Sequence, residues 1–147
     1  MLRQDKIKNI NRIIDANINR AKEGLRVCEE ITRFILDSRS LTEGFKKIRH
    51  QIDTLLKGIA SSAGLLKARE SLKDVGRNIS AGELKRRGLE DIFFANIQRI
   101  KESLRVLEEF SKLENIKIAV RFKKLRYSIY ELEKKVAREI RSLCHHR

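Results

Sequence analysis

The chain has 147 residues, of which 37% are charged and 5% aromatic, with no proline, no tryptophan and a formal net charge of +14. This length suits one domain with a real core, and a proline-free chain rich in Leu, Ile, Lys, Glu and Arg favours helices. Two cysteines exclude a disulfide framework, and no apolar run approaches the ~20 residues needed to cross a bilayer.

The first predicted hairpin joins two long helices. Residues 5–36 carry apolar residues at helical spacing, and residues 37–40 interrupt the pattern. Ser40, with Glu43 three residues later, forms a candidate capping box. We therefore expect a second helix from Leu41 to about Lys57. Its buried stripe should comprise Phe45, Ile48, Ile52 and Leu55.

The central segment, residues 58–90, differs in composition because five of the seven glycines fall within it. Short helices joined by loops are expected there, at residues 65–72 and 81–87. A second hairpin follows, with helices near 91–113 and 117–143. Strand-period alternation does not persist anywhere in the sequence. The pattern therefore predicts a single all-α domain over residues 1–147, with the central segment lying across one end.

The two predicted hairpins repeat one another. Residues 16–30 match residues 95–109 at 11 of 15 positions, with a shift of 79. Residues 45–50 match residues 122–127 at four of six positions, with a shift of 77. We interpret residues 15–57 and 91–143 as an internal repeat, which predicts a helical bundle made of two pseudo-symmetric antiparallel hairpins.

Polar residues interrupt the apolar face of each repeat. At about 100° per residue, Asn17 and Gly24 fall within the core-facing stripe of the first repeat, and Arg20 lies at its flank. That stripe comprises Ile14, Ile18, Ala21, Leu25, Cys28, Ile31 and Ile35. The second repeat places Asn96, Arg99 and Ser103 in the same arrangement. A buried amide needs a hydrogen-bond partner, so these residues either bind a neighbouring helix or line a pocket between the halves.

Three further features admit a functional and a structural interpretation. Glu23 and Glu102 follow Arg20 and Arg99 by three residues, a spacing that favours an ion pair along the helix. The matching pairs Arg49-His50 and Arg126-Tyr127 either contact a ligand, with His50 as a proton-transfer group, or wedge helices apart. Cys28 is expected to be a core residue, and Cys144-His145-His146 an adventitious metal binder.

The central segment holds a second cluster of polar residues. Asp74 can hold Mg²⁺ or accept a proton, and Arg69 and Arg77 can bind phosphate. Gly76 permits a turn with positive φ or the close approach of a ligand. Without further information, a solvated Asp-Gly turn is the favoured interpretation.

The positive charge indicates either affinity for anions or a solvated surface. Residues 117–147 contain ten Lys or Arg against three Glu. They lack an aromatic platform and a recognisable motif, which argues against nucleic-acid binding. No Gly-rich phosphate loop and no Ser-His-Asp arrangement is present. The N-terminus lacks the apolar core of a signal peptide, so a cytoplasmic protein without a membrane partner is expected.

The motifs together resemble a small bacterial family of thiamine biosynthesis. They are Asp15-Ala-Asn17, Arg20, Glu23-Gly-Leu-Arg-Val27, Arg33-Phe34, Leu125-Arg-Tyr127, Tyr130 and Glu133, with Arg69 and Asp74-Val-Gly76 in the central segment. Members of this family occur alone or fused ahead of thiamine-phosphate synthase, and many carry that enzyme's name. The synthase is a TIM barrel, which this chain cannot form. One departure is Glu70, where an Asp is expected.

The resemblance implies a kinase that uses ATP and Mg²⁺ to phosphorylate hydroxymethylpyrimidine phosphate to its diphosphate. Asp74 and Arg69 would be catalytic, Asp74 would hold Mg²⁺, and Gly76 and Arg77 would form a phosphate loop. The residues expected to bind substrate are Asn17, Arg20, Glu23, Gly24, Asn96, Arg99, Glu102, Arg49, Arg126 and Tyr127. We expect the two Asn-Arg pairs to line a cleft between the hairpins.

Two other functions remain open at the level of sequence. The chain can instead be a non-catalytic helical module that binds thiamine-phosphate synthase or a phosphorylated metabolite. The other alternative is a basic helical protein that binds nucleic acid through residues 117–147, with an affinity that falls steeply with salt. Whether the chain forms a homo-oligomer also remains open.

Overall fold

The computed structural model describes residues 3–59, 62–78 and 81–146, and it confirms the all-α prediction. The α-helices are α1 (Arg3–Glu30), α2 (Arg39–Leu56), α3 (Ser62–Ala68), α4 (Leu89–Ser111) and α5 (Ile116–His145). A π-helical stretch, Ile31–Ile35, prolongs α1, and two 3₁₀ turns, Ser71–Lys73 and Ala81–Leu84, lie between α3 and α4. In the described ranges, no helix has both the length and the apolar character that a bilayer crossing requires.

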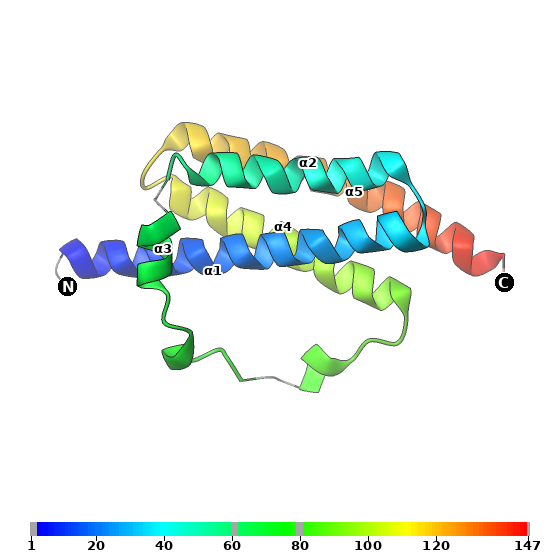
Figure 1. Ribbon diagram of the computed structural model, residues 1–147, viewed down its shortest axis with the longest axis horizontal. Coiled ribbons are helices and arrows are strands. Elements are labelled where there is room, and N and C mark those ends of the chain that lie inside the picture. The colour runs from blue at the N-terminus through cyan, green and yellow to red at the C-terminus, as the bar shows by residue number, and fades with distance from the viewer. Residues whose placement is uncertain (1–2, 60–61, 79–80, 147) are drawn as a thin grey trace.

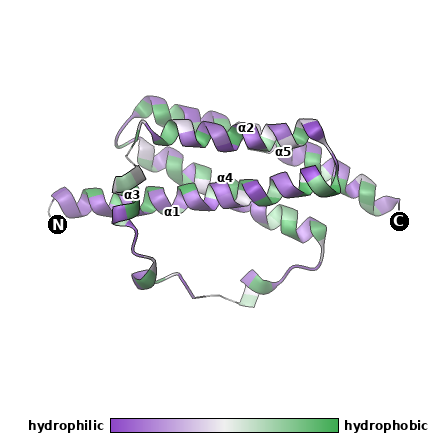
Figure 2. Ribbon diagram, viewed as in Figure 1, coloured by the Kyte–Doolittle hydropathy of each residue, from purple (hydrophilic) through white to green (hydrophobic). Residues whose placement is uncertain are grey.

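The four long helices form two layers. Figure 1 shows α1 and α4 side by side in one layer and running in opposite directions, with α2 and α5 in the other. The most extensive packing is between α1 and α4, followed by α4 with α5. Apolar and hydrophilic residues alternate along each long helix (Figure 2), as expected for amphipathic helices with one buried stripe. The core contains three fully buried aromatic rings, Phe45, Phe93 and Phe122.

The central segment runs along the bundle, so the prediction that it lies across one end is wrong. Helix α2 ends near the start of α1, whereas α4 begins at the opposite end of the bundle (Figure 1). Since α2 and α4 point in the same direction, the chain must travel the length of the bundle between them. This path brings the described parts of the segment past the layer formed by α1 and α4.

The first hairpin turn differs from its predicted form. The N-cap of α2 is Ser38, whose hydroxyl accepts a hydrogen bond from Leu41 N at 3.4 Å, and not Ser40. Helix α1 ends at Glu30 and continues as a π-turn, which adds a residue to the turn and rotates the following side chains. Ile35, predicted to be buried, is therefore 48% exposed.

Other boundaries agree more closely with the predictions. Helix α3 ends at Ala68, four residues before the predicted end, and the helix predicted at 81–87 is a 3₁₀ turn. Helix α4 begins two residues before its predicted start. Asn115 caps α5, because its side chain accepts hydrogen bonds from Lys117 N and Ile118 N. The predicted break at residues 114–115 is thus confirmed.

Candidate functional site

Helices α1 and α4 pack closely against each other at Gly24. A Cβ built on Gly24 would lie 2.8 Å from Ile100 Cγ1 and 3.1 Å from the carbonyl oxygen of Asn96. Gly24 lies on the core-facing stripe of α1, where the lack of a side chain leaves space for a neighbour. The structure fills the space with a helix, since a larger side chain would push α4 away.

The charged residues beside this crossing point away from the α2/α5 layer. Arg20 lies about 40° from Gly24 around α1 but about 160° from Lys22, which pairs with Asp53 of α2. The same spacing on α4 separates Arg99 from Lys101, which pairs with Glu133 of α5. We call this side of the bundle the outer face. It comprises Asn17, Arg20 and Glu23 of α1 and Asn96, Arg99 and Glu102 of α4.

The two asparagines of the outer face are held in the same way. Asn17 Nδ2 donates to the carbonyl oxygen of Ile13 at 2.8 Å, and Asn96 Nδ2 donates to that of Ile92 at 2.8 Å. Asn17 is buried and Asn96 is partly exposed. Of the two interpretations left open, bonds from these amide nitrogens to a neighbouring helix are not what the structure shows, because each amide nitrogen bonds within its own helix. The amide orientation is nonetheless fixed, which leaves each side-chain oxygen turned away from the helix backbone.

The arginines of the outer face are exposed and lack carboxylate partners. Arg20 Nη1 donates weakly to Asn17 Oδ1 at 3.4 Å, and Glu102 accepts from Gln98 at 3.0 Å. These contacts replace the predicted ion pairs along each helix. Among the ion pairs within 4.0 Å in the described part of the chain, none involves the guanidinium groups of Arg20 or Arg99. Both cations are thus available to an anionic ligand.

Arg69 anchors one end of the central segment to α1. Its Nε and Nη2 donate to the two oxygens of buried Asp15, each at 2.8 Å. This bidentate pair raises the pKa of Arg69 above its ordinary value, through the hydrogen bonds first and the charge of Asp15 second. Glu70 pairs with Lys8 at 2.7 Å nearby. Arg69, predicted to be catalytic, is thus committed to an ion pair that positions the segment.

Most of the described residues between Arg69 and α4 are exposed to solvent. We call residues 69–78 and 81–88 the connecting segment, and every one of residues 71–78 and 81–88 is exposed. Asp74 Oδ1 accepts from Gly76 N at 2.9 Å, and Arg77 donates to the carbonyl oxygen of Leu72 at 3.4 Å. Gly76 does not take a positive φ, the first of the two roles considered for it. Asp74 therefore sits in the solvated turn that the sequence favoured.

The structure does not place Asp74 among other metal-binding groups. In the described ranges, no cluster of three or more His, Cys, Asp or Glu side chains is arranged to hold a metal ion. Mg²⁺ does not require such a cluster when substrate phosphates supply most of its ligands. A single carboxylate from Asp74 is compatible with that kind of site.

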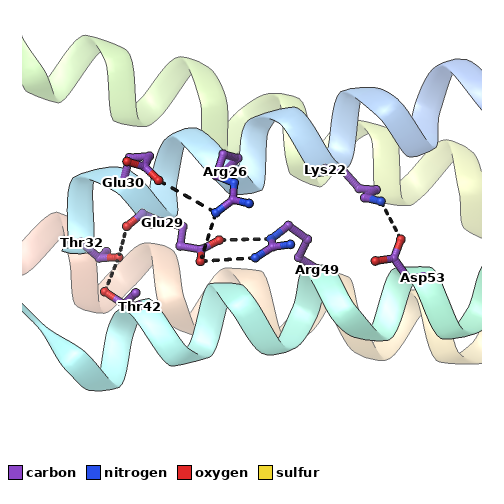
Figure 3. Close-up of polar contacts among 8 residues, drawn as sticks. All are labelled: Lys22, Arg26, Glu29, Glu30, Thr32, Thr42, Arg49 and Asp53. Carbon is purple, nitrogen blue, oxygen red and sulfur yellow. Dashed lines mark hydrogen bonds and ion pairs between the residues drawn. The ribbon is translucent and has the colours of Figure 1, made fainter. Parts of the chain in front are cut away.

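Arg49 and Arg126 lie away from the outer face, each in a cluster of charged residues between two helices. We call the cluster of Arg26, Glu29 and Arg49 between α1 and α2 the first seam, and the cluster of Arg105, Glu108 and Arg126 between α4 and α5 the second seam. Figure 3 shows the first seam, where Arg49 donates to both oxygens of Glu29, at 3.2 and 3.4 Å, and Arg26 approaches from the same helix as the acid. The Glu29 side chain is only 4% exposed. A buried carboxylate needs such partners. These contacts commit Arg49 to a bond between α1 and α2.

The second seam repeats this arrangement between α4 and α5. Arg126 Nη2 donates to Glu108 at 3.1 Å, and Arg105 also pairs with Glu108. Burial raises the pKa of the Glu108 carboxyl, but the hydrogen bonds from Arg105 and Arg126 outweigh it and hold the pKa below its ordinary range. Sequence analysis did not single out Glu29 and Glu108. The repeat could have indicated them, because Glu29 and Glu108 occupy matching positions, each three residues after a matching arginine.

Tyr127 and Tyr130 give the second seam an aromatic edge. Their rings stand edge to face with centroids 5.5 Å apart, and Arg126 donates to the Tyr130 hydroxyl at 2.9 Å. Tyr127 remains 55% exposed. The matching position in the first seam holds His50, also exposed, so His50 does not act as a buried wedge. The predicted substrate residues thus fall on two sides of the bundle, and the predicted catalytic and phosphate-loop residues lie in the connecting segment, so the described site residues do not meet in one pocket.

The cysteines have the environments expected for structural or terminal positions. Burial, and then the charge of Glu133, raises the pKa of Cys28 to about 12. Its thiol is therefore protonated and unreactive at neutral pH. Cys144 is exposed in the last turn of α5.

Comparison with known proteins places the chain among relatives of larger size. Residues 12–135 match the ThiD2 family. A thiamine-phosphate synthase from Synechocystis sp. is 41% identical over 131 residues, which are 84% of this chain and 35% of that protein. The thiamine-phosphate synthase of Rhodopirellula baltica is 38% identical, over 88% of this chain and 36% of its own length. The chain thus spans about a third of the length of these relatives. No solved structure is significantly similar to it.

Proposed function

This chain belongs to the ThiD2 family, and from that premise we propose that it acts in thiamine biosynthesis as a kinase. The reaction converts 4-amino-5-hydroxymethyl-2-methylpyrimidine phosphate to the diphosphate, with ATP as the phosphoryl donor and Mg²⁺ as the cofactor. The observation that carries this proposal is the family match over residues 12–135, together with the resemblance of the individual motifs. Relatives named thiamine-phosphate synthase support the pathway, and their name describes proteins about two and a half times as long.

The chemistry of this reaction suits the groups that the chain offers. The attacking atom is an oxygen of the pyrimidine phosphate, the bond between the β-phosphate and the γ-phosphoryl group breaks, and ADP leaves. A phosphate monoester is already largely ionised at pH 7, with a second pKa of about 6, so its oxygen needs no general base. The demands are therefore positioning and neutralisation of charge, which cations on helices can meet.

We assign the reaction to the outer face. Arg20 and Arg99 are exposed cations without carboxylate partners, one from each repeat, and they flank the crossing of α1 and α4. One arginine from each repeat suits a reaction in which two phosphorylated substrates, ATP and the pyrimidine phosphate, must bind next to each other. The side-chain oxygens of Asn17 and Asn96 can accept a hydrogen bond from an amino group of the pyrimidine or of the nucleotide base.

The connecting segment would complete the site from the other side. It is fixed at one end by Arg69 on Asp15 and at the other by Arg87 N, which donates to Asp91 Oδ2 at 2.9 Å. Between these anchors its described parts loop out beside the layer formed by α1 and α4, on the side away from α2 and α5 (Figure 1). Closure over the outer face would bring Asp74 to the Mg²⁺ and Arg77 to the phosphates. Such closure would also exclude water from the transfer.

Coupled release of ADP tests the proposal. Purified protein is supplied with Mg-ATP and either the pyrimidine phosphate or the unphosphorylated alcohol. We expect turnover with the phosphate and none with the alcohol, because the existing phosphate is both the nucleophile and the recognised group. No turnover with either substrate, from protein shown to be folded, would remove the kinase and leave a binding module.

A further inference from the structure

The turn between α1 and α2 is longer than its counterpart between α4 and α5. The sequence match shifts from 79 residues before the turn to 77 after it, so the first turn holds two additional residues. The π-turn at Ile31–Ile35 and Asp37, with φ of 50°, take up this extra length. The turn therefore has a shape that the second hairpin does not reproduce.

A hollow of about 520 Å³ lies beside this longer turn. Three cationic side chains line it, Arg33, Arg39 and Lys46. None of the three has a carboxylate partner within 4.0 Å in the described part of the chain, whereas the matching residue to Arg33 in the second turn, Lys112, pairs with Glu109 at 2.6 Å. Cations gathered around a hollow and left without partners are available to an anion.

Hydroxyl groups add hydrogen-bonding capacity to the hollow. Ser38 and Thr42 both line it. The Ser38 oxygen accepts from Leu41 N, so its own proton remains free to donate. Three cations and a hydroxyl donor match the several acceptor oxygens of a phosphate group.

The hollow is also lined by carboxylates, so a ligand that binds there has to fit negative as well as positive side chains. Glu29 also lines it, but Arg49 and Arg26 already neutralise this acid. Asp37 and Glu43 are exposed and would repel a bare anion. Mg²⁺ is commonly bound through one or two carboxylates together with substrate phosphates. A diphosphate that carries Mg²⁺ therefore accounts for both kinds of charge around the hollow.

We propose that this hollow binds a diphosphate group together with Mg²⁺, at a site separate from the outer face. Thirteen residues separate Arg33 from Arg20, which is roughly 20 Å along the helix at 1.5 Å per residue. A ligand in the hollow therefore does not contact the proposed site of transfer. The site depends on the geometry of the first turn and exists whether or not the chain is a kinase.

Titration calorimetry with inorganic pyrophosphate and Mg²⁺ at physiological salt tests the site. The test variant is Arg33→Gln/Lys46→Gln. The control is Lys112→Gln/Lys123→Gln, which removes two cations from the matching positions of the second hairpin and changes the net charge equally. We expect saturable binding that weakens at least tenfold in the test variant and less than twofold in the control.

A third variant examines the role of the carboxylates. In Asp37→Asn/Glu43→Gln, pyrophosphate should bind no more tightly with Mg²⁺ than without it. Absence of saturable binding to the parent chain would overturn the site, as would equal weakening by the test and control variants, which would indicate diffuse attraction to a basic surface. Retention of the Mg²⁺ effect in the third variant would overturn the assignment of Asp37 and Glu43. None of these outcomes depends on catalysis, so they are distinct from failure of the proposed kinase activity.

Discussion

Arg20 separates a catalytic from a structural interpretation of the outer face. Its guanidinium is exposed and makes only the long hydrogen bond to Asn17. Arg20→Ala should therefore leave the thermal midpoint within a few degrees, since surface substitutions cost within about 0.5 kcal/mol. Turnover should fall at least about 100-fold if the cation neutralises charge in the transition state.

Arg26→Ala is the matched control for this prediction. It removes the same side chain from the same helix, but Arg26 faces the seam and pairs with Glu29. Steady-state rates and thermal melts of both variants provide the comparison. Equal losses of activity in the two variants, or a loss in Arg20→Ala that follows its stability, would return Arg20 to a structural role.

Gly24 carries a prediction about stability. An alanine Cβ would meet Ile100 Cγ1 at 2.8 Å and the Asn96 carbonyl oxygen at 3.1 Å, and a backbone oxygen cannot move aside easily. Gly24→Ala should lower the free energy of unfolding by about 1–3 kcal/mol, even though alanine favours a helix. Gly82→Ala is the control, because a Cβ there meets nothing within 4 Å. Urea titrations that show no difference between the two variants would contradict the close approach of α1 and α4.

At the scale of elements, the connecting segment is held by one strong contact at its first end. Arg69→Ala removes the bidentate pair with Asp15 and should free that end. We expect trypsin to cleave at Lys73 and Arg77 several times faster than in the parent chain, with little change in the thermal midpoint, because residues 71–78 are already exposed.

Glu70→Ala provides the comparison for the cleavage experiment. It removes only the exposed pair with Lys8, which should contribute little to the anchoring. Limited proteolysis followed by mass spectrometry measures both variants. If Glu70→Ala accelerates cleavage as much as Arg69→Ala, the Asp15 contact is not the anchor.

The helix boundaries show which parts of the fold could be predicted from the sequence. Helical periodicity and the Glu114-Asn115 break predicted α4 and α5 to within a few residues, because local patterns determine amphipathic helices. The π-turn after Glu30 could not be predicted, because periodicity assumes a constant helical pitch. The path of the central segment depended on the relative directions of α2 and α4, which is a tertiary property.

The site was harder to predict than the fold for a related reason. Asn17 and Arg20 became candidates from their place on or beside an apolar stripe, but the stripe does not reveal hydrogen-bond partners. Asn17 bonds to its own helix, a choice that the sequence left open. Glu29 and Glu108 were missed because an acid next to another acid on a charged helix resembles a solvated surface. Only packing shows that they are buried.

At the scale of the whole molecule, the seam between α4 and α5 makes stability depend on pH. The pKa of Glu108 is depressed in the folded chain, so its contribution to stability is present above the ordinary Glu value of about 4.3 and disappears as the pH falls through the lower folded value. Glu108→Gln should be less stable than the parent chain by roughly 2 kcal/mol at neutral pH. The difference between the two should shrink as the pH falls below the ordinary Glu value and through the lower folded pKa of Glu108.

Denaturant titrations at several pH values check this dependence. Glu109→Gln is the control, because the Glu109 side chain is 45% exposed and its pairs with Arg105 and Lys112 are on the surface. Its effect at neutral pH should be much smaller. A Glu108→Gln effect that stays constant from pH 7 to pH 3 would show that the charge of the acid does not stabilise the seam.

Phosphorus NMR of the reaction mixture tests the central claim most directly. The spectrum identifies which atom receives the phosphoryl group, which release of ADP alone does not. With Mg-ATP and the pyrimidine phosphate, we expect the monophosphate signal to be replaced by the coupled pair of a diphosphate monoester, in equal amount to the ADP formed. Unchanged ATP and monophosphate, or orthophosphate released from ATP without a new diphosphate, would contradict the assignment of this helical chain as a pyrimidine phosphate kinase.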